Sequence, residues 1–191
     1  FPTRRSSDLE GVTLDLGAAG KGIGCDAAKK ILDADKNVSG MILNLGGSSV
    51  MSYGSKPDGS AWQVAVTDPR DTEGDYLGVV TLNGTEFLST SGDYEKYFVE
   101  DGVRYHHILD PATGYPARSG LTSVTVVCDD GLNADGLSTA CFVLGKEKAE
   151  ELFRKWYEKM LELKEQKNTA ETQWKRKQEE LGEEPEYEEI T

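Results

Sequence analysis

Residues 15–35 read DLGAAGKGIGCDAAKKILDAD, a glycine-rich segment followed by a helical pattern. Before it, Val12–Leu16 has the apolar character of a short strand. After it, apolar residues recur at the steps of one helical face, at Ile23, Ala27, Ala28, Ile31 and Leu32. The stretch therefore predicts a strand that runs through a glycine turn into a helix ending near Asp35.

The chain beyond this helix alternates short apolar runs with turn signals. Single strands are predicted at Met41–Leu45, Ala61–Thr67 and Leu121–Cys128. Asn83-Gly84 and Asp101-Gly102 predict two hairpins, because these dipeptides favour tight β-turns. The hairpin strands are Tyr76–Leu82 with Thr85–Leu88, and Tyr94–Val99 with Val103–Leu109.

A second helix is predicted over Asp135–Leu144, ending at Gly145. A third has an apolar stripe at helical spacing, formed by Ala149, Leu152, Phe153, Trp156, Met160 and Leu163. These helices, with the strands, predict an α+β fold. The stripe fails after Lys164, and residues 178–191 hold seven glutamates, so residues 166–191 are predicted to be a charged, disordered tail.

Composition and net charge argue against several classes of protein. The net charge of −13 argues against binding a nucleic acid backbone. No stretch reaches the roughly 18 apolar residues that a membrane span needs. The three cysteines are widely spaced, which indicates neither a disulfide framework nor a zinc knuckle. The first nine residues, FPTRRSSDL, match the in-frame translation of a short-read sequencing adapter and are set aside as artefactual.

The glycine-rich segment could receive a phosphate, because backbone amides at a helix N-terminus attract anions. It is not a P-loop, since Asp15 and Gly22 stand where that motif needs glycine and a hydroxyl residue. A relaxed dinucleotide pattern, Gly22-x-Gly24-x-x-Ala27, lacks the acidic residue expected at the end of the next strand. A tight strand-to-helix turn without a ligand remains the alternative.

Asp135, Ser138 and Thr139 share one face of the predicted second helix. Three oxygens there would suit Mg²⁺, although an Asp at the start of a helix is more often the N-cap than a ligand. His106 and His107 are adjacent in a predicted strand, so at most one should face a given site. Either could be structural or an acid-base group. The hydroxyls of Ser89-Thr90-Ser91-Gly92 indicate turn chemistry.

Six segments in this order resemble the ApbE family, the FAD:protein FMN transferases. They are DLGAAGKGIGCDAA (15–28), MILNLGGS (41–48), WQVAVTDP (62–69), LSTSGDYEKYF (88–98), YHHILDPATGYP (105–116) and NADGLSTACFVLG (133–145). The resemblance covers about Thr13 to Phe153. It implies an ApbE-like fold, with a mixed, mostly antiparallel sheet and packed helices, in a partial domain over residues 10–165.

The resemblance also implies an extracytoplasmic, membrane-anchored enzyme, with a lipid anchor in a preceding N-terminal portion. Such an enzyme uses Mg²⁺ to move FMN from FAD to a Thr or Ser hydroxyl of an acceptor flavoprotein, and AMP leaves. The family's metal positions fall on Ala18, Asp135, Ser138 and Thr139. Ser138 stands where some members carry a second Asp.

The family's FAD contacts fall on Asp15, Lys21 and Leu109, and its acid-base histidine falls on His107. Asp110 is a candidate to orient that histidine. Two other functions use the same residues. One is a Mg²⁺-dependent FAD pyrophosphatase, and the other is a non-catalytic flavin-binding or interaction module that holds a partner through the C-terminal helix.

Overall fold

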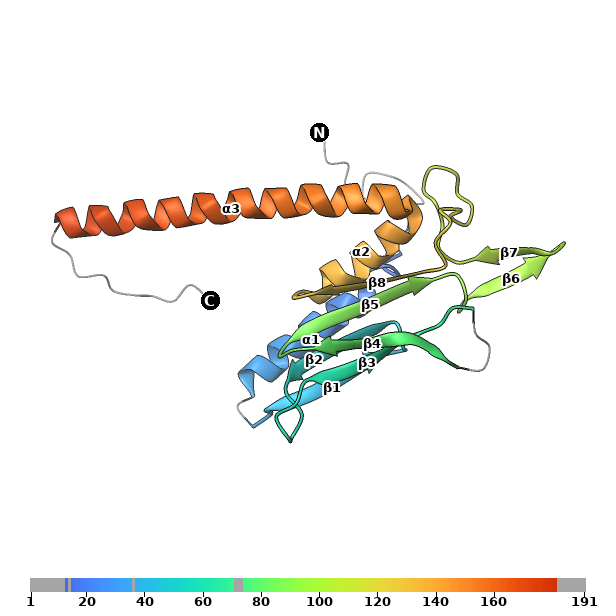
Figure 1. Cartoon of the computed structure of the whole chain (residues 1–191), viewed down its shortest axis with the longest axis horizontal. Coiled ribbons are helices and arrows are strands. Elements are labelled where there is room, and N and C mark those ends of the chain that lie inside the picture. The colour runs from blue at the N-terminus through green and yellow to red at the C-terminus, as the bar shows by residue number, and fades with distance from the viewer. Residues whose placement is uncertain (1–12, 14, 36, 71–73, 182–191) are drawn as a thin grey trace. The chain divides into compact units, whose positions relative to one another are not determined.

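The computed structural model describes residues 13, 15–35, 37–70 and 74–181 (Figure 1). The chain divides into two units, residues 1–146 and 147–191. The adapter-like segment and the glutamate-rich end, residues 182–191, lie outside the described residues.

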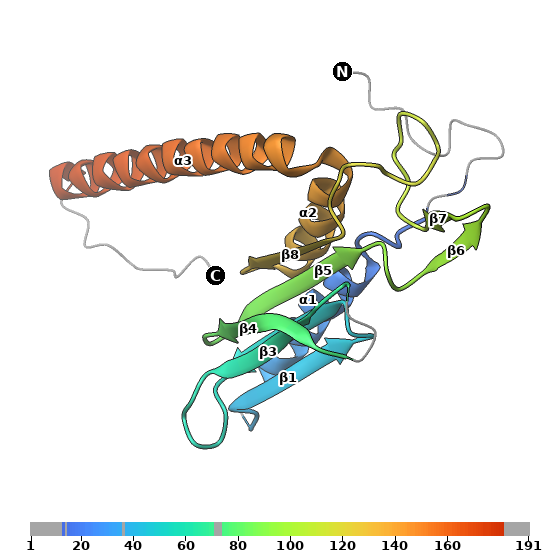
Figure 2. The same ribbon diagram turned by 45° about the vertical axis from the view of Figure 1, so that its right-hand side comes forward.

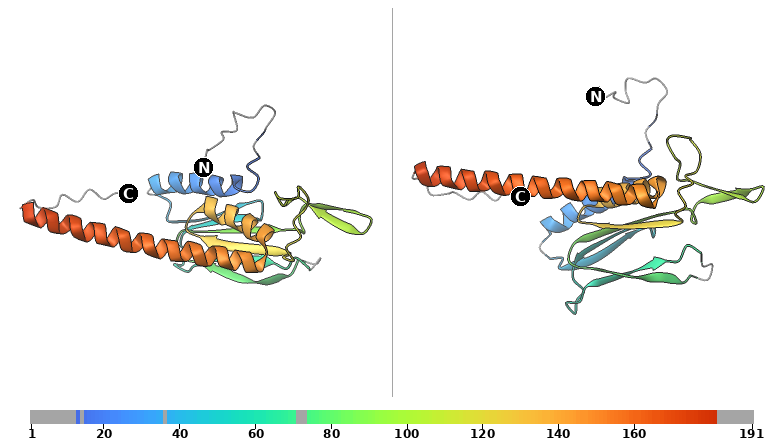
Figure 3. Two further views of the ribbon diagram at one scale, coloured as in Figure 1. Left: turned by 90° about the horizontal axis from the view of Figure 1, so that it is seen from above. Right: turned by 45° about the horizontal axis from the view of Figure 1, so that its top comes forward.

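The first unit is built on a four-stranded antiparallel sheet with the order β1-β2-β5-β8. Its strands are β1 (Gly40–Leu45), β2 (Ser49–Gly54), β5 (Glu86–Gly92) and β8 (Ser123–Cys128). Two helices, α1 (Gly20–Ala34) and α2 (Gly131–Leu144), lie together on one face of this sheet (Figures 1 and 3). The α+β class and the mixed arrangement of helices and antiparallel sheet are confirmed.

Side chains alternate between two cores because successive residues of a strand point to opposite faces. Met51 and Phe87 pack with Cys25 and other residues of the helices. Val50 and Leu88, one position along in each strand, pack on the opposite face with Leu82. That second core joins the sheet to a separate two-stranded sheet of β3 (Trp62–Thr67) and β4 (Tyr76–Leu82).

The hairpin predicted at Asn83-Gly84 is wrong. The strand before it, β4, pairs with β3, and the strand after it, β5, pairs with β2 and β8. A two-residue type I′ turn needs positive φ at both central residues, and here Gly84 has it (φ +67°) while Asn83 does not. The Asn-Gly pair therefore connects two sheets.

The hairpin predicted at Asp101-Gly102 is confirmed, with shorter strands than predicted. Its strands are β6 (Tyr97–Glu100) and β7 (Val103–His106). Both turn residues have positive φ, +48° at Asp101 and +75° at Gly102. Figure 2 shows the hairpin extending beyond the end of the four-stranded sheet.

Other elements also differ from the predictions, and for three of them the structure shows the physical reason. The described residues of Val12–Leu16 form no strand, because the Leu16 carbonyl accepts hydrogen bonds from the Ala19 and Gly20 amides in a turn that leads into α1. Strand β2 was not predicted, since its inward serines hide the apolar pattern. Helix α2 begins at Gly131, and its N-cap is Asp130, whose side chain accepts from the Asn133 amide at 2.7 Å.

The second unit contains helix α3 (Lys146–Leu181), which begins at the last residue of the first unit. The helix continues through residues predicted to be disordered from position 166. Ion pairs at i,i+4 accompany it on both sides of that position, as in Glu151–Lys155 (2.6 Å) and Lys167–Glu171 (3.7 Å). No helix among the described residues is both long and apolar enough to cross a membrane.

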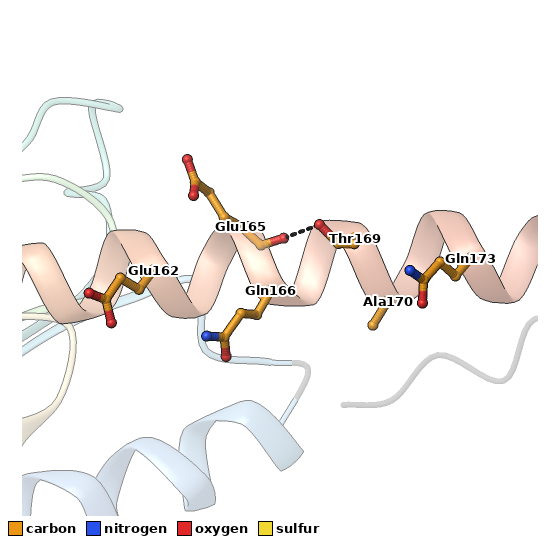
Figure 4. A pocket seen from close by; sticks show the side chains of 6 residues that line it. All are labelled: Glu162, Glu165, Gln166, Thr169, Ala170 and Gln173. Carbon is orange, nitrogen blue, oxygen red and sulfur yellow. Dashed lines mark hydrogen bonds between the residues drawn. The ribbon is translucent and has the colours of Figure 1, made fainter.

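A shallow hollow runs along α3 (Figure 4). Its lining consists of Glu162, Glu165, Gln166, Thr169, Ala170 and Gln173. The Thr169 hydroxyl donates to the Glu165 carbonyl of the same helix at 2.8 Å. All six residues belong to one exposed face of α3.

Candidate functional site

Helices α1 and α2 approach each other at two glycines. A Cβ atom on Gly22 would lie 2.1 Å from the Gly131 carbonyl oxygen and 2.8 Å from the Asp135 Cβ. A Cβ atom on Gly131 would lie 2.5 Å from the Gly22 carbonyl oxygen. The two backbones therefore touch, and only glycine fits at either position.

Each helix caps the other at this contact. The first amides of a helix lack partners within the helix. Asp26 of α1 accepts from the Gly131 amide (2.7 Å) and the Leu132 amide (2.9 Å) at the start of α2. Asp135 of α2 accepts from the Gly22 amide at the start of α1 (2.9 Å). Each carboxylate is stabilised by the positive end of the other helix dipole.

The sheet supplies further donors to the Asp135 carboxylate, which is 7% exposed. The Ser89 hydroxyl of β5 donates to Asp135 Oδ1 at 2.9 Å, and the Ser49 hydroxyl of β2 does so at 3.4 Å. Ser49 and Ser89 are paired across the strands, and their hydroxyls are 3.1 Å apart. Three donors thus stabilise the carboxylate in its buried position.

One turn further along α2, three hydroxyls form a second cluster. The Ser91 hydroxyl of β5 lies 2.9 Å from the hydroxyls of both Ser138 and Thr139. Ser138 is 0% exposed and donates to the Asp135 carbonyl oxygen at 2.9 Å. The Ser138 hydroxyl, predicted as a metal ligand, therefore bonds within the interior, whereas Thr139 is only partly buried.

The donor set fits Mg²⁺ by its chemistry. A carboxylate offers about four lone-pair positions, and three donors bond to Asp135, so one position remains for a cation. Mg²⁺ prefers oxygen ligands, needs only one or two carboxylates and retains waters or substrate phosphates. Among the described residues no three His, Cys, Asp or Glu side chains gather as a metal site, so waters or phosphate oxygens would complete the coordination of such a cation.

The turn before α1 and the first turn of that helix carry Asp15 and Lys21, which are predicted to contact FAD, and Ala18, which is predicted as a metal ligand. Asp15 Oδ1 accepts from the Gly17 amide at 2.7 Å, and Ala18 lies exposed in the turn that follows. Lys21, in the first turn of α1, donates to the Ser48 hydroxyl between β1 and β2. Lys21 is held beside the start of α1, where its charge adds to that of the helix dipole.

The two histidines lie in different environments, as the sequence predicts. His106 is buried, with Nε2 3.0 Å from the Ala117 carbonyl oxygen and Nδ1 accepting from the Ile108 amide at 3.3 Å. His107 is exposed, with Nδ1 3.2 Å from the Lys96 carbonyl oxygen. A carbonyl can only accept, so this contact places a proton on Nδ1 and leaves Nε2 of neutral His107 free to accept one.

Asp110 and Leu109 follow His107. The Asp110 Oδ1 atom accepts from the Ala112 amide at 2.9 Å, which caps the turn over residues 110–114. The Lys96 carbonyl is therefore the group bonded to the His107 ring, in the place where the sequence predicts Asp110. Leu109 forms a bridge with Pro116 and is 53% exposed, so it presents an apolar surface to solvent.

A comparison with known protein families covers all the residues of this candidate site. The model of the ApbE family matches residues 3–162, beginning within the adapter-like segment. The chain belongs to the ApbE family. Its six resembling segments all lie within the match.

Curated ApbE relatives agree with this assignment. The FAD:protein FMN transferase of Treponema pallidum (strain Nichols) is 40% identical over 153 residues, which cover 76% of this chain and 42% of that protein. The enzyme of the same name from Escherichia coli (strain K12) is 37% identical over 148 residues, covering 78% and 41%. The chain therefore spans less than half the length of these curated relatives.

Solved ApbE structures share the fold. The ApbE protein of Thermotoga maritima matches with a TM-score of 0.68 and 44% identity, covering 77% of this chain and 47% of that one. The flavin transferase ApbE from Vibrio cholerae matches with a TM-score of 0.60 and 32% identity, covering 74% and 44%.

Sequence reasoning missed the serines that the ApbE fold brings to the site. Ser89 and Ser91, interpreted as turn residues, lie within strand β5 and bond to α2. Ser49 lies in β2, which was not predicted. The available signal was the alternation of Phe87, Ser89 and Ser91, which is the period of one strand face.

Cys25 lies beside the site but is not a nucleophile at neutral pH. Burial, followed by the negative charges of Asp26 and Asp135, raises the pKa of its thiol from 9.0 to about 11. A thiol must lose its proton to be reactive. Cys25 therefore acts as a small apolar residue of the core around Phe87.

Proposed function

We propose that this protein transfers FMN from FAD to a Thr or Ser hydroxyl of an acceptor flavoprotein and releases AMP. The observation that carries the proposal is the contact of the Asp135 carboxylate with the Gly22 amide in the first turn of α1, with Thr139 one turn further along α2, within a chain of the ApbE family. Curated relatives named FAD:protein FMN transferase support the reaction class.

The start of α1 would receive the pyrophosphate of FAD. Its amides, the helix dipole and the Lys21 ammonium group provide positive potential for a doubly charged linkage. Asp135, Thr139 and the Ala18 carbonyl would hold Mg²⁺. When bound, this cation supplies charge stabilisation as the phosphoanhydride bond breaks.

His107 would be the general base. The acceptor hydroxyl oxygen forms a bond to the phosphorus of the FMN moiety, and the bond between that phosphorus and the oxygen bridging to AMP breaks. Nε2 of His107 takes the hydroxyl proton, and its Nδ1 proton stays bonded to the Lys96 carbonyl. By the same resemblance, we propose an extracytoplasmic location with a lipid anchor to the membrane.

The test is mass spectrometry of an acceptor flavoprotein domain incubated with FAD and Mg²⁺. Two enzymes are compared, the 191-residue chain and the same chain preceded by the N-terminal half of the Thermotoga maritima relative. A mass gain equal to an FMN phosphoester, lost in Asp135→Ala and in His107→Ala, is the expected result. Release of FMN and AMP without labelling would instead indicate a pyrophosphatase, and FAD binding without turnover would indicate a flavin-binding module.

A further inference from the structure

The face of strand β5 that lies against α2 changes from apolar to polar along the strand. Phe87, Ser89 and Ser91 alternate toward α2, while Thr90 between them bonds to Thr125 of the neighbouring strand at 2.9 Å. The face begins as apolar core and ends in hydroxyls. Ser91 is 9% exposed, and its hydroxyl contacts two hydroxyls of α2.

The direction of the hydrogen bonds in this cluster follows from counting protons. A serine or threonine hydroxyl has one proton and two acceptor lone pairs. Ser138 donates its proton to the Asp135 carbonyl, which can only accept. The contact between Ser138 and Ser91 must therefore use the Ser91 proton, because none remains on Ser138.

The same count of protons gives the direction of the hydrogen bond between Ser91 and Thr139. Ser91 has given its proton to Ser138, so the 2.9 Å contact between Ser91 and Thr139 must use the proton of Thr139. The chain of donors runs from Thr139 to Ser91, then to Ser138, and ends at the Asp135 carbonyl. No donor among the described residues reaches the Thr139 oxygen, so both of its lone pairs remain for a cation.

We propose that Ser91 is a positioning residue that fixes the Thr139 hydroxyl as an acceptor for the divalent cation. The inference rests on the proposed function, because it takes Thr139 as a cation ligand. Without the Ser91 oxygen, the Thr139 proton has lost its acceptor on the sheet and the hydroxyl can rotate. A proton turned toward a cation weakens binding, since the cation requires a lone pair.

The test measures binding of Mn²⁺, used as a probe for Mg²⁺, to the purified 191-residue chain by electron paramagnetic resonance of the free ion. Ser91→Ala should weaken Mn²⁺ binding about tenfold, the lower end of the effect of groups that orient metal ligands. Ser91→Thr keeps the hydroxyl and should bind within about twofold of the original chain. Thr139→Val removes the ligand itself and should bind least.

Two controls separate positioning from a general loss of structure. Thr90→Val removes a hydroxyl from the same strand but from its other face, and Ser52→Ala removes a buried hydroxyl of β2 that bonds to the Glu86 backbone. Both should destabilise the fold and leave Mn²⁺ affinity unchanged. If Ser91→Ala is unfolded by circular dichroism, the nearly isosteric Ser91→Cys is used instead, and its weaker hydrogen bonding should also lower the affinity.

Each outcome is decisive. Unchanged Mn²⁺ affinity in folded Ser91→Ala or Ser91→Cys overturns the inference and leaves the proposed function standing. An equal loss in Thr90→Val overturns it as well, because the effect would then be structural. Absence of Mn²⁺ binding by the original chain overturns both the inference and the metal-dependent part of the proposed function.

Discussion

Replacing Gly22 by alanine tests the contact between α1 and α2. The new Cβ atom would lie 2.1 Å from the Gly131 carbonyl oxygen, so the helices must separate by about 1 Å. Overpacking of this kind costs about 1–3 kcal/mol. Separation also disrupts the bond from the Gly22 amide to the Asp135 carboxylate, and a bond to a charged group contributes about 1.5–3 kcal/mol.

Helix propensity acts in the opposite direction, because alanine is favoured over glycine by about 1 kcal/mol. The net expectation for Gly22→Ala is a loss of about 1.5–5 kcal/mol in the free energy of unfolding, measured by urea denaturation with far-UV circular dichroism. Gly136→Ala in α2 is the matched control, since its Cβ would meet nothing within 4 Å. The control should be neutral or more stable. If Gly22→Ala matched it, the close approach of the helices would be refuted.

Three further predictions concern the same region. Asp26→Ala should lower the free energy of unfolding by about 1–3 kcal/mol, because it removes two caps of α2, whereas Asp130→Ala removes one and should lose less in the same urea titration. The folded state holds the Cys25 proton more tightly than the unfolded state, so this stabilisation is complete below pH 9 and is lost as the pH rises through about 11. Cys25→Ala should therefore lose less stability than the original chain between pH 9 and 11 in thermal unfolding scans, and parallel curves would contradict the assigned pKa. His107→Ala should abolish FMN labelling of the acceptor and leave Mn²⁺ affinity unchanged, and full labelling would exclude it as the base.

Local patterns predicted the elements whose own residues determine them. Helix α1 ends at Ala34, within one residue of the end predicted from its apolar face. The β6–β7 turn has the positive φ values that Asp101-Gly102 favours. The hairpin predicted at Asn83-Gly84 does not form, because the pairing of a strand depends on the core into which its side chains pack. Leu82 enters the core shared with β3, which no local pattern could reveal.

The candidate site could likewise be predicted only in part from the sequence. The family resemblance predicts Asp135, Thr139 and His107 as site residues, but the groups that bond to them come from other segments of the chain. Ser89 lies 46 residues before Asp135 and bonds to its side chain. The partner of the His107 ring is a backbone carbonyl, that of Lys96, and a carbonyl has no signature in sequence.

The two carboxylates that cap the helices differ in their expected effects. Asp26 should affect stability alone, whereas Asp135 should affect both stability and cation binding. Among the described residues, the hydrogen bonds that Asp26 accepts come from the start of α2, whereas Asp135 accepts from α1 and from both Ser49 and Ser89 of the sheet. Gly22→Ala should therefore lower both stability and Mn²⁺ affinity, because it displaces a donor to Asp135. Asp26→Ala should lower stability alone at temperatures where the variant is folded. Equal losses of affinity in the two variants would mean that the helix pair, and not the Asp135 carboxylate with its own donors, sets the geometry of the proposed cation site.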